Sequence, residues 1–134
     1  MIAGTGSGCG KTTVTLAVLR AMQRRKIPLA AFKCGPDYID PMFHKAVLGI
    51  PSRNLDLFFI SEREVRGQIV RSIPQNGLGV IEGVMGFYDG VSGTTDTASA
   101  AHLARETGTP AILVVRPKGQ SLSLSRRPSG LRKT

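Results

Sequence analysis

The chain has 134 residues, of which 41% are hydrophobic, and a formal net charge of +9. This length suits one domain with a substantial hydrophobic core. The sequence has no apolar run long enough to span a bilayer, and glycines interrupt the apolar residues soon after Met1, so we expect neither a membrane helix nor a secretory signal. The expected location is the cytoplasm, where Cys9 and Cys34 would be reduced thiols.

Most of the positive charge lies towards the C-terminus. Residues 116–134 carry six of the nine excess positive charges and no acidic residue. Such a segment can bind the phosphates of a nucleic acid, but this one has no aromatic side chain to stack on bases. Nucleic-acid binding is therefore a minor alternative.

The chain begins with an apolar run, a glycine-rich turn and a Lys-Thr-Thr triplet that starts at Lys11. This order is typical of a strand, a phosphate-binding loop and a helix. The backbone N–H groups of such a loop surround an anion, the lysine adds charge near the β- and γ-phosphates, and the Thr12 hydroxyl suits a magnesium ion. The usual pattern has glycine where this chain has Thr5, but Gly4 lies one residue earlier, so we expect a variant loop. The predicted nucleotide-binding residues are Gly6, Ser7, Gly8, Cys9, Gly10, Lys11, Thr12 and Thr13.

A second informative stretch follows a predicted strand at residues 29–34. Its Gly-Pro and Asp-Pro pairs interrupt regular structure, so Lys33, Asp37 and Asp40 are expected at a loop where the strand ends. Ligands bind at this edge of open α/β sheets. A surface turn with solvated aspartates is the alternative interpretation.

A third stretch combines a short buried strand at Val80 and Ile81 with Glu82, Gly83 and a glycine-rich loop that continues to Gly90. A carboxylate at the end of such a strand can reach magnesium directly or through water. The glycines allow the loop to pass close to a bulky substrate. Together with the predicted phosphate loop, this stretch indicates a phosphate site.

The remaining patterns alternate helices and a strand. Helices are expected at residues 11–25 and 41–50, from a capping box at Ser61 to Ile73, and from an N-cap among Thr94, Thr95 and Asp96 to Gly108, with a strand at residues 110–115. Residues 51–56 are expected to form a polar connection, whose Arg53 and Asp56 are candidates to face the site, and His44 is expected to be a packed or surface residue. The alternation predicts an α/β fold with a parallel sheet and helices on both faces.

The three stretches, residues 4–13, 33–40 and 82–90, closely resemble the N-terminal ATP-binding domain of the cobyrinate a,c-diamide synthase family, relatives of dethiobiotin synthetase. The resemblance covers residues 1–123 and implies a phosphate-loop NTPase-like sheet that is incomplete at its C-terminal end. Residues 124–134 have the basic, polar composition of a disordered tail. Nothing in the chain corresponds to the family's glutaminase domain, so we expect a truncated or frame-shifted product.

The resemblance also implies an activity and roles for individual residues. It implies ATP-dependent conversion of the a and c carboxylates of cobyrinate into amides through acyl phosphates, with glutamine or ammonia as nitrogen donor. Lys11 and Lys33 would screen the reacting anions, Asp37 and Asp89 would position substrate or assist ammonia, and Thr12, Asp40 and Glu82 would hold Mg²⁺. The expected partners are a corrinoid substrate, a glutaminase domain or free ammonia, and a second copy of the chain.

Two other functions are compatible with the same motifs. A related amidating enzyme would act on hydrogenobyrinate or a nickel sirohydrochlorin. A switch ATPase of the partitioning or cell-division type would use ATP to control dimerisation. Those ATPases usually carry an extra lysine early in the loop, at the position of Gly6, so the sequence disfavours them.

Overall fold

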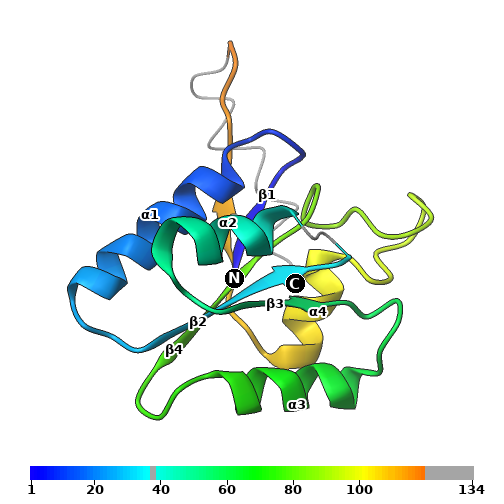
Figure 1. Cartoon of the computed structure of the whole chain (residues 1–134). Helices are drawn as coiled ribbons and strands as arrows, with labels where there is room; N and C mark the ends of the chain where they lie inside the picture. Colours follow the sequence, from blue (N-terminus) through cyan, green and yellow to red (C-terminus); the bar gives the residue numbers. More distant parts are fainter. Residues whose placement is uncertain (37–38, 120–134) are drawn as a thin grey trace.

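The computed structural model describes residues 1–36 and 39–119, apart from the side chains of residues 39–43. Within this part, one sheet has the strand order β3-β2-β4-β1-β5, and all its strand pairs are parallel. The elements follow one another in the order β1 (Ile2–Gly4), α1 (Lys11–Arg24), β2 (Leu29–Cys34), α2 (Ile39–Leu48), β3 (Ser52–Leu55), α3 (Glu62–Ser72), β4 (Leu78–Glu82), α4 (Ala100–Thr107) and β5 (Ile112–Val114) (Figure 1).

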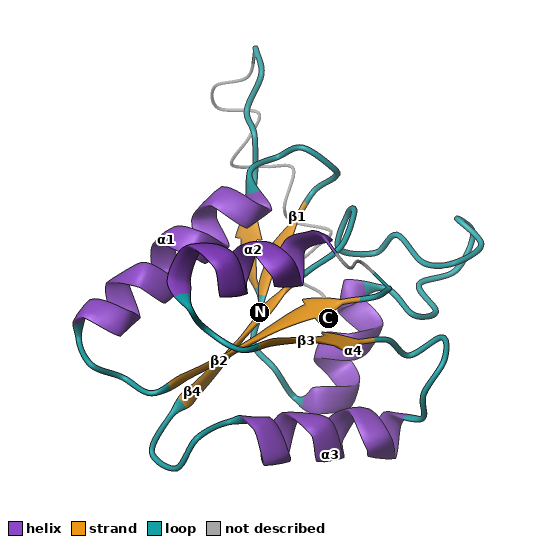
Figure 2. Ribbon diagram, viewed as in Figure 1, coloured by secondary structure: helices purple, strands orange, loops and turns teal. Residues whose placement is uncertain are grey.

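Helices cover both faces of the sheet, which confirms the predicted fold class (Figure 2). Adjacent residues of a strand point to opposite faces, and on the central strands both faces are apolar. Ala31 and Val80 pack with Leu19 of α1, whereas Phe32 and Ile81 belong to the core that includes residues of α3 and α4. Strands buried on both faces therefore appear in the sequence as continuous apolar runs.

The carboxyl ends of the strands meet at one edge of the sheet because the strands are parallel. In the register of the sheet, Glu82 pairs with Lys33 of β2 on one side and with Ile2 of β1 on the other. The strand order thus places the end of β4 between Lys33 and the loop that follows β1. Three segments far apart in the chain meet at this edge.

Residues 52–55 form β3, and the prediction of a polar connection was wrong there. The strand pairs with β2 along its whole length and has no second neighbour within the described sheet. Only Leu55 of its four residues is apolar and buried, while Arg53 is exposed. An edge strand tolerates polar side chains, so hydrophobic periodicity gave no signal for it.

The helix boundaries were mostly predictable from capping residues. The capping box at Ser61 is present, and Gly108 ends α4 in a left-handed conformation, as predicted. The N-cap of α4 was wrong: Ser99, not residues 94–96, caps it by accepting a hydrogen bond from the His102 N–H. Asp96 instead forms an ion pair with Arg105. Helix α2 begins at Ile39, two positions before the predicted start.

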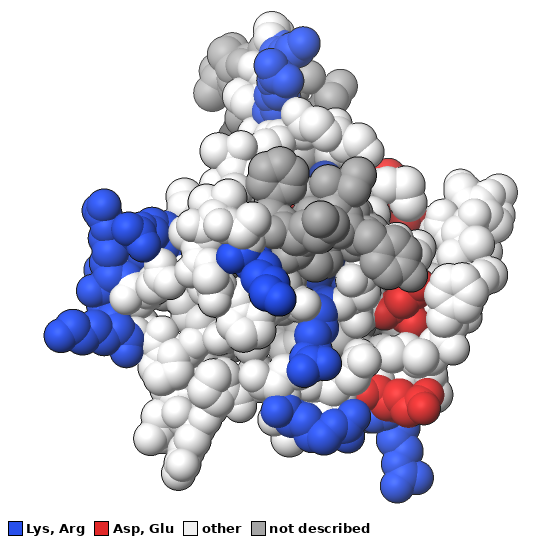
Figure 3. Space-filling model, in the orientation of Figure 1, with Lys and Arg blue, Asp and Glu red and all other residues white. Residues whose placement is uncertain are grey.

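None of the helices that the structure describes is long and apolar enough to cross a membrane. On the face shown in Figure 3, the described Lys and Arg side chains lie in separate groups, one of them over the C-terminal end of α1. Cations at a helix C-terminus complement the partial negative charge of the last carbonyl groups. This placement gives those basic residues a role in helix stability.

Candidate nucleotide-binding site

The loop between β1 and α1 has the backbone geometry that its glycines allow. Gly8 and Gly10 have φ values of 70° and 104°, a backbone conformation that residues with a Cβ atom rarely adopt. Gly10 is the N-cap residue of α1, no side chain that the structure describes caps this helix end, and its first turn contains no acidic residue. The N–H groups at this helix end are therefore suited to bind an anion.

Lys11 lies across the base of the same loop. Its side chain is 7% exposed, and Nζ donates a hydrogen bond of 2.7 Å to the carbonyl oxygen of Gly6. A Cβ atom at Gly4 would lie 2.9 Å from Cγ of Lys11, so the lysine needs glycine at position 4. Thr5 is exposed and pairs with Gly86. The departure from the usual pattern therefore leaves the path of the lysine clear.

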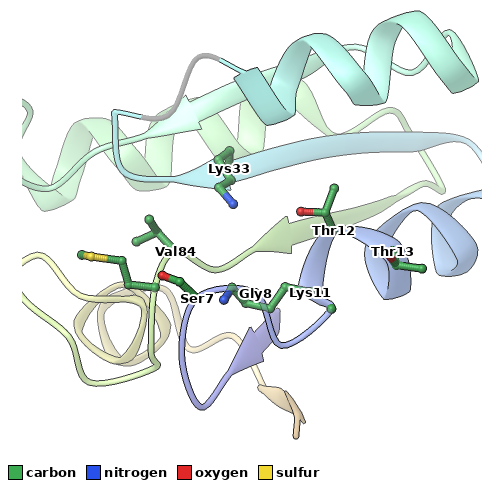
Figure 4. Close-up of a pocket in the computed structure, with 9 residues that line it drawn as sticks. Ser7, Gly8, Lys11, Thr12, Thr13, Lys33 and Val84 are labelled. Atoms are coloured by element: carbon green, nitrogen blue, oxygen red, sulfur yellow. The ribbon is translucent and has the colours of Figure 1, made fainter. Parts of the chain in front are cut away.

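A pocket of about 550 Å³ opens between this loop, the end of β2 and the segment after β4 (Figure 4). We call it the loop pocket; it is lined by Ser7, Gly8, Gly10, Lys11, Thr12, Thr13, Lys33, Val84 and Met85. Of the predicted nucleotide-binding residues, Gly6 and Cys9 belong to the loop but do not line the pocket. Its volume lies in the range of small-molecule sites.

Glu82 is fully buried beside two residues that line the pocket, Thr12 and Lys33, and accepts three hydrogen bonds from side chains. Its Oε1 accepts from Thr12 Oγ1 at 2.6 Å and from Lys33 Nζ at 3.2 Å, and its Oε2 lies 2.9 Å from Nε2 of His44. These four residues are called the Glu82 network. The network joins α1, β2, α2 and β4.

The surroundings of Glu82 favour its ionised form. Burial raises the pKa of this carboxyl, but hydrogen bonds from His44 and Thr12 and the positive charge of Lys33 outweigh burial, and the pKa falls to about 2. Lys33 is only 3% exposed, and Nζ also donates to the carbonyl oxygen of Gly83 at 3.0 Å. The charge of Lys33 is therefore held at the pocket by a buried ion pair.

The geometry of Thr12 fits a magnesium ion at the pocket. Its hydroxyl hydrogen is directed to Glu82, which leaves the oxygen lone pairs for a cation. Magnesium prefers oxygen ligands and keeps several waters. Because Glu82 already accepts from three side chains, it is suited to orient Thr12 and to act through water. Figure 4 shows the Thr12 hydroxyl and Lys33 side chain turned towards each other.

The predicted aspartates differ in where they lie. Asp37 and the side chain of Asp40 lie outside the described residues. Asp89 is exposed, does not line the loop pocket, and accepts a hydrogen bond of 2.7 Å from the N–H of Gly86. The predicted roles of all three aspartates stay predictions.

The loop after β4 is fastened to the phosphate loop. The N–H of Phe87 donates to the carbonyl oxygen of Gly4 at 2.8 Å, and Thr5 forms a bridge with Gly86. At Gly83 the two segments approach so closely that a Cβ atom would lie 3.3 Å from Cα of Ala3. The glycines predicted to admit a substrate therefore also serve the contact of the segment after β4 with β1 and the start of the phosphate loop.

The sequence-based interpretation missed the role of His44. Of the two predicted alternatives, a packed or a surface residue, the first is correct because His44 is fully buried, but both ring nitrogens have polar partners, Ser52 and Glu82. One sequence signal was available: His44 lies four residues after Asp40, which places both on one face of a helix.

A second cluster of possible metal ligands, Glu62, His102 and Glu106, lies between α3 and α4. Arg66 forms ion pairs with both glutamates. Nδ1 of His102 accepts a hydrogen bond from the N–H of Ala98, so the ring hydrogen is on Nε2, the nitrogen that faces Glu62. A nitrogen that carries hydrogen cannot bind a metal, and the cluster is better described as a surface ion-pair group.

Comparison with known proteins identifies the family. The sequence profile of the CobQ/CobB/MinD/ParA nucleotide binding domain matches residues 1–114. Proteins named cobyrinate a,c-diamide synthase are 45% identical in Salmonella typhimurium, 48% in Clostridium acetobutylicum and 40% in Thermoplasma acidophilum. These alignments cover 97% to 98% of the chain but only 28% to 30% of the relatives, so the chain spans less than a third of their length.

These findings agree with the phosphate-loop geometry and confirm the resemblance that the three motifs predicted. The matched residues contain every described element from β1 to β5. The chain belongs to the CobQ/CobB/MinD/ParA nucleotide binding domain family, and within it resembles the corresponding part of cobyrinate a,c-diamide synthases.

Proposed function

We propose that this chain binds ATP with Mg²⁺ and serves the ATP-dependent amidation of the a and c carboxylates of cobyrinate, a step of cobalamin biosynthesis. The observation that carries the proposal is the loop pocket, which is lined by Lys11, Lys33 and Thr12 and where Thr12 and Lys33 both donate to the ionised Glu82. The names of relatives that are 40% to 48% identical support the substrate class.

The proposed reaction suits a pocket that is lined by two lysines and a threonine. A carboxylate oxygen of the substrate attacks the γ-phosphorus, the bond to ADP breaks, and an acyl phosphate forms. The nitrogen of ammonia then attacks the acyl carbon, phosphate leaves with its bonding electrons, and the nitrogen loses a proton. The approaching groups are both anionic, so the cationic side chains lower the barrier by neutralising their charge.

The described residues have separate tasks in this scheme. The loop N–H groups and Lys11 bind the phosphates, and Lys33 offers charge where the carboxylate and the γ-phosphate meet. Thr12 would hold Mg²⁺, with Glu82 orienting its hydroxyl; the ion supplies further neutralisation of phosphate charge. From the resemblance, Asp40 would join the metal site, and Asp37 and Asp89 would position the substrate or assist ammonia.

The nitrogen source and the substrate are finer parts of the proposal. Glutamine, through a glutaminase domain, or free ammonia would supply the nitrogen. Hydrogenobyrinate and nickel sirohydrochlorin are the alternative tetrapyrroles. The family description also includes MinD and ParA, so a switch ATPase remains the second candidate.

The test is the release of ADP from MgATP by this chain with cobyrinate and ammonium, each omitted in turn. We expect ADP only when cobyrinate is present, with repeated turnover only when ammonium is added as well, and loss of ADP release in the Lys11→Ala variant. The longer synthase of Salmonella typhimurium serves as the positive control. ADP release that ignores the corrinoid would support a switch ATPase and contradict the proposal.

A further inference from the structure

His44 occupies a position that the proposed chemistry does not yet use. It is fully buried in α2, and its ring bridges two other segments. Nδ1 lies 3.0 Å from Oγ of Ser52, at the start of β3, and Nε2 lies 2.9 Å from Oε2 of Glu82, at the end of β4. The fully buried ring therefore has a polar partner at each nitrogen.

The direction of the hydrogen bond to Glu82 follows from its partners. An ionised carboxylate only accepts hydrogen bonds, so Nε2 of His44 must carry the hydrogen and donate it. The hydroxyl of Ser52 can complete the arrangement by donating to Nδ1 or by accepting from it. His44 is therefore the donor that holds one of the two carboxylate oxygens.

The other oxygen of the same carboxylate accepts from Thr12 and Lys33. The terminal torsion of a glutamate is broad, so a carboxylate held at one oxygen can still turn. Binding of Oε2 by His44 removes that freedom and keeps Oε1 directed at Thr12. We propose that His44 is a positioning residue that, through Glu82, fixes the Thr12 hydroxyl for magnesium-bound nucleotide and thereby couples α2 to the phosphate loop.

This inference rests on the proposed nucleotide and magnesium site. It also makes the position of α2 along its own axis important for function, because this helix carries both Asp40 and, four residues later, His44. A shift of α2 along its axis would withdraw the donor from Glu82 and release the orientation of Thr12. Outer-shell partners of this kind typically change metal affinity by about 10- to 100-fold when they are removed.

Three variants separate positioning from packing. His44→Leu replaces the ring with an apolar side chain of similar size and removes the hydrogen-bond donor. His44→Gln retains an N–H group that can reach Glu82. Ser52→Ala removes the other partner of the ring and leaves the bond to Glu82, so it is the matched control for a general loosening of α2.

The first measurement is the binding of a fluorescent ATP analogue to the 134-residue chain as Mg²⁺ is increased from zero. We expect His44→Leu to raise, by about tenfold, the Mg²⁺ concentration at which the increase in analogue binding is half-maximal. Analogue affinity without Mg²⁺ should stay within about twofold, because His44 acts through Glu82 on the Thr12 hydroxyl that would hold the metal. His44→Gln and Ser52→Ala should both stay close to the original chain. Equal Mg²⁺ dependence in all four proteins would overturn the inference.

The second measurement does not need nucleotide. The methyl resonance of Thr12 in a ¹³C–¹H NMR spectrum reports the environment of its side chain, and thermal unfolding reports the stability of each variant. We expect the resonance to move in His44→Leu and to return in His44→Gln, with Ser52→Ala unchanged. An unmoved resonance, or the same movement in Ser52→Ala, would overturn the inference. Failure of the original chain to bind the analogue would refute the proposed function, and the NMR comparison would still decide the role of His44.

Discussion

The phosphate loop and the Glu82 network both contribute residues to the loop pocket but are built in different ways. The loop is a continuous segment whose anion-binding groups are backbone N–H groups, and Lys11 and Thr12 follow it at the start of α1. The network joins side chains of four separate elements around one buried carboxylate. The loop therefore depends on local backbone geometry, whereas the network depends on the whole fold.

The largest effect is expected at the centre of the network. Glu82→Gln removes the charge that balances buried Lys33, and breaking a buried ion pair costs about 3–5 kcal/mol of folding free energy. We expect loss of amidation together with this destabilisation, measured by ADP release and urea unfolding.

A double variant separates the loss of stability from the loss of amidation. Adding Lys33→Met to Glu82→Gln removes the unbalanced charge, so stability should recover while activity stays absent. Near-normal amidation in Glu82→Gln would remove Glu82 from the magnesium site.

A change at the loop should act mainly on nucleotide binding and less on the stability of the fold. Lys11→Ala removes a cation from the phosphates, and a hydrogen bond to a charged group is worth about 1.5–3 kcal/mol, so ATP should bind about 10- to 100-fold more weakly. Calorimetric titration measures this affinity, and urea unfolding should show a smaller loss of stability than Glu82→Gln causes. An unchanged affinity would contradict the role of Lys11.

Acid should weaken the network before it affects the loop. The pKa of Glu82 is lowered from 4.5 to about 2 in the folded chain. A lowered pKa stabilises the fold at pH values above the unfolded pKa of 4.5, and this contribution is lost as the pH falls towards 2.

The stability difference between the original chain and Glu82→Gln should therefore narrow as the pH falls from about 6 to about 3. Urea unfolding at a series of pH values measures it. A difference that stays constant over this range would show that the charge of Glu82 does not stabilise the fold.

The smallest expected effect concerns the two cysteines, of which Cys9 lies in the loop and Cys34 at the end of β2. Cys9 is partly exposed in the loop, whereas Cys34 is 2% exposed. Burial, helped by the negative charge of Asp56, raises the pKa of the Cys34 thiol to about 12 against the opposing effect of Lys33.

Iodoacetamide should therefore modify Cys9 alone in the folded chain, as peptide mass spectrometry would show. Nucleotide should slow the reaction because the adjacent Gly8 and Gly10 line the pocket. Labelling of Cys34 at a similar rate would contradict its burial.

The contrast between local and long-range structure also explains which parts of the fold and the site could be predicted from the sequence. The phosphate loop, β2, β4 and the capping box at Ser61 arise from neighbouring residues, and their local patterns were sufficient. Three motifs were also sufficient to predict the family. The prediction failed where the structure depends on partners distant in sequence.

Three residues illustrate that limit. Arg53 lies in a polar edge strand that only its pairing with β2 defines. Ser99 caps α4, although Asp96 has the same capping chemistry. Asp96 instead forms an ion pair with Arg105 of α4. His44 has no motif of its own, and its bond to Glu82 joins residues 38 positions apart in the chain.

The proposed amidation is tested most directly by following heavy oxygen from labelled cobyrinate carboxylates, in the presence of this chain, MgATP and ammonium. If the carboxylate attacks the γ-phosphorus, each phosphate released with amide should carry one labelled oxygen from the corrinoid. Phosphate that contains oxygen from water instead, or ATP consumption without amide, would contradict the account.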